Sequence, residues 1–202
     1  MRYLMTHSLL SSWIWSMKDS PYADATNEAD PMESFMRVLR REPGEVTDAI
    51  QNGNEFEELV TDIASGWDRD TKHWHDAAAQ IAQKVRGGVF QFKGYKDAQI
   101  CGMDVLLYGK LDVLKAGTIY DIKFSKNYDV GKFFESTQHP MYFELVPEAD
   151  RFEYLVSNGS GVWTEAYRRD ETRSILPDIE AFYGWLETVG LMDLYREYWC
   201  SK

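Results

Sequence analysis

Three charged residues on two neighbouring segments have the types and spacing of a hydrolytic metal site. Asp112 closes one apolar segment, and Asp121 and Lys123 stand two residues apart in the next. Side chains alternate between the faces of a strand, so Asp121 and Lys123 are expected on one face and Ile122 on the other. An alanine-glycine pair at 116–117 predicts a tight turn that brings Asp112 beside Asp121.

Two carboxylates and a lysine are the minimal apparatus for metal-dependent hydrolysis of a phosphodiester. In a partly buried site the carboxylates repel each other and lose hydration, and a hard divalent cation relieves both effects. Mg²⁺, or Mn²⁺ in its place, is expected because it takes oxygen ligands and keeps several waters. An ordinary interpretation stays open, in which Asp112 opens a turn and Asp121 pairs with Lys123 on a solvated face.

The segment from Tyr128 to Val146 adds Gln138 and Tyr142, four residues apart and therefore on one face of a helix. The series Asp, Asp-x-Lys and Gln-x-x-x-Tyr resembles the PD-(D/E)XK nuclease superfamily, specifically its RecB-like and lambda-exonuclease-like branch. The resemblance covers about residues 8–160 in order. It implies a restriction-endonuclease-like core, an α/β fold in which α-helices flank a mixed central β-sheet, and the order of the predicted elements indicates the same class.

In the resembling branch, a helix before the sheet carries Gly-x-x-x-His or an acidic equivalent, which supplies a further metal ligand. The segment from Gly53 to Val60 fits this pattern with Glu57 in the ligand position, although glutamate stands in place of histidine. Glu55 and Glu58 share a helical face while Glu57 points elsewhere, so Glu58 is the alternative ligand. A solvated acidic face is the ordinary interpretation of the same residues.

The resemblance also implies roles for the site residues. The implied metal ligands for Mg²⁺ or Mn²⁺ are Glu57, Asp112, Asp121 and the carbonyl of Ile122. Lys123 would position the attacking water or stabilise charge on the phosphate, and Gln138 and Tyr142 would orient the DNA end or the lysine. The implied catalytic residues are Asp112, Asp121, Lys123, Gln138 and Tyr142.

Composition indicates how the rest of the chain is organised. With 202 residues, 44% of them hydrophobic, the chain can bury one sizeable core, and we expect a single domain over 1–202 with its core at about 45–167 and helical extensions at both ends. Residues 21–31 are predicted to form a polar loop. The predicted strands are Val89–Tyr95, Ala98–Tyr108, Gly109–Leu114, Thr118–Ser125, Arg151–Ser157 and Val162–Tyr167, and the predicted helices include an amphipathic first helix, Met32–Arg41, Ala77–Arg86, Ile175–Val189 and Leu191–Trp199. Cys101 is expected to be buried in its strand.

The net charge of −11 opposes nucleic-acid binding, which draws much of its strength from contacts between cations and phosphates. A local basic groove can nevertheless exist on an acidic protein. Six lysines cluster in sequence around the predicted site: Lys93, Lys96, Lys110, Lys115, Lys126 and Lys132. Four aromatic residues there could stack on unpaired bases or belong to the core: Tyr95, Tyr108, Tyr128 and Phe133.

These observations together predict a Mg²⁺- or Mn²⁺-dependent deoxyribonuclease that acts on linear DNA or free ends. The expected setting is phage or mobile-element recombination, where a recombination protein would be its partner. The alternative is an inactive module with the nuclease fold that binds nucleic acid or a protein. A cytoplasmic location without membrane contact is expected, because polar residues interrupt the apolar N-terminal segment and no run reaches about twenty apolar residues.

Overall fold

The structure is a computed structural model, and it describes residues 1–18, 30–67 and 73–201. Within these ranges seven strands form one sheet in the order β6-β5-β4-β3-β1-β7, with β2 paired to β3. The strands are β1 (Arg2–Thr6), β2 (Val89–Ile100), β3 (Met103–Lys115), β4 (Thr118–Phe124), β5 (Arg151–Ser157), β6 (Val162–Arg168) and β7 (Cys200–Ser201). β1 pairs with β3 and β4 with β5 in parallel, and the other pairs are antiparallel.

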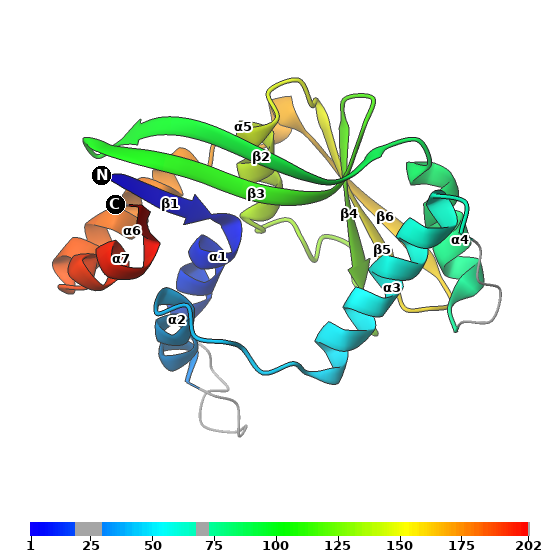
Figure 1. The fold of residues 1–202 in the computed structure, drawn as a ribbon, viewed down its shortest axis with the longest axis horizontal. Helices are drawn as coiled ribbons and strands as arrows, with labels where there is room; N and C mark the ends of the chain where they lie inside the picture. Colours follow the sequence, from blue (N-terminus) through cyan, green and yellow to red (C-terminus); the bar gives the residue numbers. More distant parts are fainter. Residues whose placement is uncertain (19–29, 68–72, 202) are drawn as a thin grey trace.

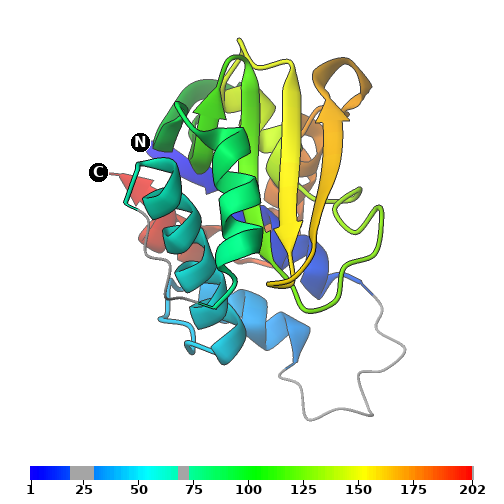
Figure 2. The same cartoon turned by 90° about the vertical axis from the view of Figure 1, so that its right-hand side faces the viewer.

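Helices cover both faces of this sheet (Figure 1). They are α1 (His7–Ser16), α2 (Pro31–Leu39), α3 (Asp48–Ala64), α4 (His75–Val85), α5 (Gln138–Leu145), α6 (Leu176–Thr188) and α7 (Met192–Trp199), with a short 3₁₀ turn at Arg169–Glu171. One apolar core joins α1, α2, α5, α6 and α7 to the sheet, and a second joins α3 and α4 to it. Figure 2 shows α3 and α4 lying in front of the strands. The predicted α/β fold with a mixed central sheet and flanking helices is therefore confirmed.

Local sequence explains α3, which carries Glu57. The Thr47 hydroxyl accepts a hydrogen bond from the amide of Ile50 at 3.3 Å and caps the first turn. Phe56, Val60 and Ile63 recur at helical spacing and are buried against α4 and the sheet. The capped apolar stripe fixes which side of α3 faces inward.

The long hairpin of β2 and β3 corrects three predictions. Residues 98–108 do not form one strand, because Cys101 and Gly102 have φ angles of 51° and 74° and make the turn between β2 and β3. Two consecutive left-handed residues are typical of a tight hairpin turn. Cys101 is exposed at this turn, so its predicted burial is wrong. The break predicted between residues 108 and 109 is also absent, since β3 runs unbroken to Lys115.

The N-terminal segment begins with a strand that the local sequence pattern does not predict. β1 precedes α1 and is inserted between β3 and the short edge strand β7. Its residues pair with Asp104 to Tyr108, about a hundred residues further along the chain. Five residues cannot reveal such a partner through their own periodicity.

The C-terminal elements agree with their predictions. α6 and α7 lie where two amphipathic helices were expected, and β5 and β6 form the expected hairpin. Residues 21–29 of the predicted polar loop fall outside the described ranges. In the described part of the chain, no helix has the length and apolar character required to cross a bilayer.

Candidate functional site

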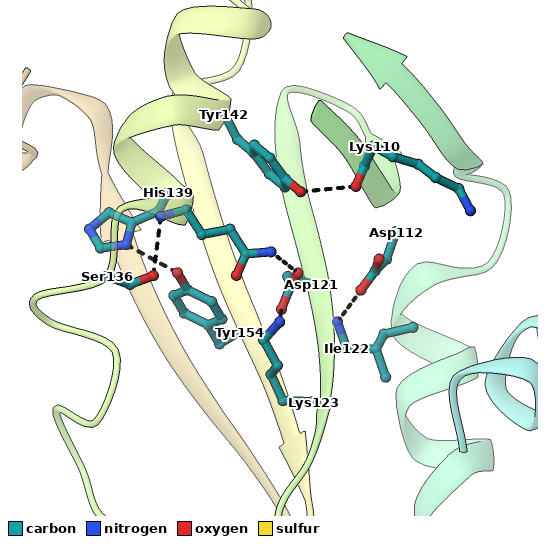
Figure 3. A network of polar contacts seen from close by, with 10 residues as sticks. Lys110, Asp112, Asp121, Ile122, Lys123, Ser136, His139, Tyr142 and Tyr154 are labelled. Carbon is teal, nitrogen blue, oxygen red and sulfur yellow. Dashed lines mark hydrogen bonds and ion pairs between the residues drawn. The ribbon is translucent and has the colours of Figure 1, made fainter. Parts of the chain in front are cut away.

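The predicted carboxylates meet where β3 and β4 separate. Their ladder ends at the pair Val113 and Tyr120, and Asp112 and Asp121 occupy the next position in the same register. The amide of Ile122 donates a hydrogen bond of 2.8 Å to Oδ2 of Asp112 (Figure 3). A side-chain carboxylate thus takes the place of backbone pairing at the point of separation.

Asp121 and Lys123 form a close ion pair on the same side of β4, as their spacing predicts. Nζ of Lys123 lies 2.7 Å from Oδ2 of Asp121, and the two side chains are 34% and 3% exposed. Ile122 belongs to the other apolar core, beneath α3 and α4. The carboxylate is therefore buried, while about a third of the lysine side chain is exposed.

Gln138 and Tyr142 hold the site from α5, although their contacts differ from the roles implied by the resemblance. Nε2 of Gln138 donates to Oδ1 of Asp121 at 2.5 Å. The hydroxyl of Tyr142 donates to the backbone carbonyl of Lys110 at 2.9 Å. Gln138 therefore orients the aspartate, and Tyr142 fastens α5 to β3 beside the site.

Two glycines let α5 approach the sheet closely enough for these contacts. Gly94 and Gly109 are paired across β2 and β3. A Cβ atom on Gly109 would lie 2.6 Å from Cε1 of Tyr142, and one on Gly94 would lie 2.9 Å from Cβ of Leu145. The glycines are required here for close approach, because any larger residue would displace the helix that carries Gln138.

Glu57 approaches the site from α3. Its Oε1 accepts a hydrogen bond of 2.6 Å from Nε2 of Gln91, and its charge acts on Asp112. Gln91 is left-handed, with φ of 54°, and stands opposite Asp112 in a register that is interrupted at this position. Glu58 is exposed. Of the two alternative glutamates, the structure brings Glu57 to the aspartates.

These charges act on one another. Burial, then the charges of Asp121 and Glu57, raise the pKa of Asp112 well above its usual range, against the opposing effects of the Ile122 amide and of Lys123. Burial alone would lower the pKa of Lys123, but the neighbouring carboxylates outweigh it and raise that pKa, Asp121 most strongly. The site therefore holds an excess of negative charge that its one lysine does not neutralise.

His7 belongs to this cluster and was not predicted. Its ring meets that of Tyr142 edge to face with centroids 5.4 Å apart, and its carbonyl accepts a hydrogen bond of 3.1 Å from Thr137. Burial, and then the charge of Lys123, lower the pKa of His7 to about 4. The pairing of β1 with β3 and the contacts of His7 with Thr137 and Tyr142 join segments far apart in the chain, so the local sequence carried no signal for His7.

His139 faces away from the aspartates. Its Nδ1 lies 3.2 Å from the hydroxyl of Tyr154, and its ring stacks on Tyr167 with centroids 4.1 Å apart. His139 is therefore a packed side chain held by Tyr154 and Tyr167.

Comparisons with known proteins concern the fold. No protein-family model matches the chain, and no curated protein matches it. The crystal structure of SSO0001 is similar, with a TM-score of 0.51 and 10% sequence identity over 92% of this chain and 76% of that one. At this identity the likeness supports the α/β architecture alone.

Proposed function

We propose that this chain is a Mg²⁺- or Mn²⁺-dependent nuclease that hydrolyses DNA phosphodiester bonds. The observation that carries the proposal is the unneutralised charge around Asp112, whose pKa is raised by burial and by Asp121 and Glu57. Such clustering of carboxylates costs free energy in a structural role and is useful in binding a divalent cation.

The chemistry of the donors fits a hard cation. Among residues 1–18, 30–67 and 73–201 no group of three or more metal-ligating side chains is already arranged around a common point. Glu57, Asp112, Asp121 and the Ile122 carbonyl are nevertheless all oxygen donors, which is the set that Mg²⁺ prefers. A divalent ion held there would polarise the scissile phosphate and lower the pKa of a bound water.

The other residues orient these ligands or act on the substrate. Gln138 fixes the rotamer of Asp121 through its bond to Oδ1. The side chain of Lys123 is 34% exposed, and in the proposed mechanism its ammonium would exchange Asp121 for a water or a phosphate oxygen. In that position the positive charge would stabilise the negative charge that develops during phosphodiester attack.

The finer assignment rests on the resemblance of the motif series. We propose exonuclease action on linear DNA or free ends, in phage or mobile-element recombination or end processing, with a recombination protein as partner. The series Asp112, Asp121-x-Lys123 and Gln138-x-x-x-Tyr142 supports this branch of the superfamily.

The decisive experiment compares linear with covalently closed duplex DNA in Mg²⁺, Mn²⁺ or EDTA. We expect metal-dependent loss of linear DNA, with little cleavage by Asp121→Asn, and calorimetric Mn²⁺ binding by the wild type but not by that variant. Glu58→Gln is the matched control, since Glu58 is an exposed neighbour of Glu57. Equal Mn²⁺ binding by wild type and Asp121→Asn would remove Asp121 from the metal site.

A second candidate is an inactive module that keeps the nuclease fold and binds nucleic acid or a protein. The observation in its favour is that both Asp121 oxygens already have partners within the chain, Lys123 and Gln138. Failure to cleave DNA or RNA, single- or double-stranded, with either metal would favour this candidate.

A further inference from the structure

A strip of two lysines and two tyrosines extends from the candidate site along the hairpin of β2 and β3. Alternate residues of β3 are buried, whereas Tyr108, Lys110 and Asp112 lie on its more open face. The register of the hairpin places Lys93 opposite Lys110 and Tyr95 opposite Tyr108. We call these four residues, Lys93, Lys110, Tyr95 and Tyr108, the ribbon strip.

The lysine pair of the ribbon strip is not neutralised. Lys93 and Lys110 are exposed and directly opposite each other, and neither has an ion pair or a side-chain hydrogen bond within the described residues. Like charges at opposite positions of a sheet destabilise it. Lys96, on the other side of the hairpin, instead pairs with Glu144 at 2.7 Å. An acidic chain thus leaves two cations free beside Asp112, where an anionic ligand can neutralise them.

The tyrosine pair follows one step further from the site. The rings of Tyr95 and Tyr108 lie with centroids 5.2 Å apart at an interplanar angle of 35°, and Tyr95 is 58% exposed. Successive side-chain pairs on one face of a strand are about 7 Å apart. The strip therefore presents the lysine pair first and the tyrosine pair next, with increasing distance from Asp112 along β3.

We infer that the ribbon strip binds an unpaired DNA strand, with Lys93 and Lys110 on its phosphates and Tyr95 stacked on a base. This inference rests on the proposed nuclease function and names its substrate class. Exposed aromatic rings favour single strands because the bases of a duplex already stack on one another, and stacking on a side chain requires no particular sequence. The strip would lead the strand to the carboxylates.

The test measures binding in EDTA, where cleavage cannot occur. Fluorescence anisotropy with a labelled oligothymidylate would compare wild type, Lys93→Gln/Lys110→Gln and Tyr95→Ala. We expect the lysine variant to lose affinity and its salt slope, log K against log salt, to become shallower by about 1.4, because each phosphate contact on a single strand contributes about 0.7. Tyr95→Ala should bind about tenfold more weakly.

Matched controls separate the strip from general effects. Lys96→Gln removes a lysine that Glu144 already neutralises, and Trp15→Ala removes a ring that is 63% exposed on α1. Both should bind like the wild type, and thermal unfolding verifies that every variant folds. Equal losses of affinity in the controls and the strip variants would overturn the inference, and so would unchanged affinity in the strip variants. It would also be overturned if a duplex bound more tightly than the single strand and Tyr95→Ala left that duplex binding unchanged.

The result is independent of whether the chain cleaves DNA. Strip-dependent binding without cleavage in Mg²⁺ or Mn²⁺ would refute the proposed nuclease and support the strip as a nucleic-acid site. Cleavage with unchanged binding by the strip variants would support the nuclease and refute the strip.

Discussion

Asp112 accepts the amide hydrogen of Ile122 at 2.8 Å, across the point where β3 and β4 part. This bond anchors one carboxylate of the candidate site to the strand that carries the other. It also partly offsets the cost of ionising Asp112, because an amide donor stabilises the charged form. The remaining cost makes a specific prediction about stability.

Asp112→Asn should raise the free energy of unfolding in EDTA at neutral pH. An asparagine oxygen still accepts from Ile122, while the repulsion by Asp121 and Glu57 disappears. Because the folded pKa of Asp112 is raised, wild-type stability falls as pH rises from the ordinary aspartate value toward the folded pKa. Chemical denaturation across that pH range should show this slope in the wild type and less of it in the variant.

The exposed Asp129→Asn serves as the control for this experiment, since it removes a carboxylate outside the cluster. A clear loss of stability in Asp112→Asn would mean that the ionised carboxylate stabilises the fold.

Lys123→Ala should lower the cleavage rate in saturating Mg²⁺ by two to three orders of magnitude, about 2.7–4 kcal/mol, the usual effect of losing a charge-stabilising contact. Its stability should fall mainly in EDTA, where buried Asp121 loses its ion pair and no cation replaces it. Single-turnover kinetics and calorimetric Mn²⁺ binding measure the two effects, with exposed Lys126→Ala as control. Activity within about threefold of wild type, under roughly 0.7 kcal/mol, would make Lys123 structural.

Gln138→Ala should reduce cleavage of linear DNA about 10- to 100-fold and leave metal affinity unchanged, because Gln138 orients Asp121 without binding metal itself. Tyr142→Phe should keep activity and lose about 1 kcal/mol of stability, since only the bond to the Lys110 carbonyl disappears. Initial rates and denaturant titrations distinguish the two. If Tyr142→Phe cleaved DNA more slowly than Gln138→Ala, the result would instead indicate that the Tyr142 hydroxyl contacts the substrate.

Gly109→Ala should destabilise the protein by about 1–3 kcal/mol, because the added methyl group would overlap the ring of Tyr142. Gly53→Ala is the matched control: a methyl group added there on α3 would meet no atom within 4 Å beyond its own stretch of helix, and alanine should stabilise that helix by about 0.5–1 kcal/mol. Thermal unfolding measures whether each substitution stabilises or destabilises the protein. A neutral Gly109→Ala would show that α5 can shift without cost.

His7→Gln should make the free energy of unfolding depend less on pH between pH 4 and 7. The folded pKa of His7 is lowered to about 4, so its contribution is present above the ordinary histidine value and is lost as pH falls toward 4, by up to about 1.4 kcal/mol per pH unit. The pKa of His139 is also lowered to about 4, so the part of the pH dependence of stability that comes from His139 remains in the variant. Unfolding free energies between pH 4 and 7 provide the comparison, and identical slopes would place His7 in solvent.

Local patterns were sufficient for part of the candidate site. Strand alternation predicted the shared side of Asp121 and Lys123, and the four-residue spacing of Gln138 and Tyr142 predicted their common helix. Both depend on residues close in sequence, whose geometry follows from the element alone. The same holds for the register of the turn that brings Asp112 opposite Asp121.

The remaining features depend on contacts between distant segments. The partner of Gln138 is an oxygen of Asp121, and the left-handed backbone of Gln91 brings its side chain to Glu57. Neither follows from propensity, since each requires that α5 or α3 be already packed on the sheet. The turn at Cys101 was not predicted for a related reason, because the apolar residues on both sides of it are typical of one continuous strand.

The position of β1 has a consequence for the order of folding. Arg2 pairs with Asp104 on one side and with Ser201 on the other, so β1 completes a sheet of high contact order. A chain emerging from the ribosome keeps this strand unpaired until β3 has been synthesised. His7 follows β1 directly, and it joins Tyr142 only after that late pairing. Assembly of the candidate site is thereby tied to a pairing between segments about a hundred residues apart in the chain.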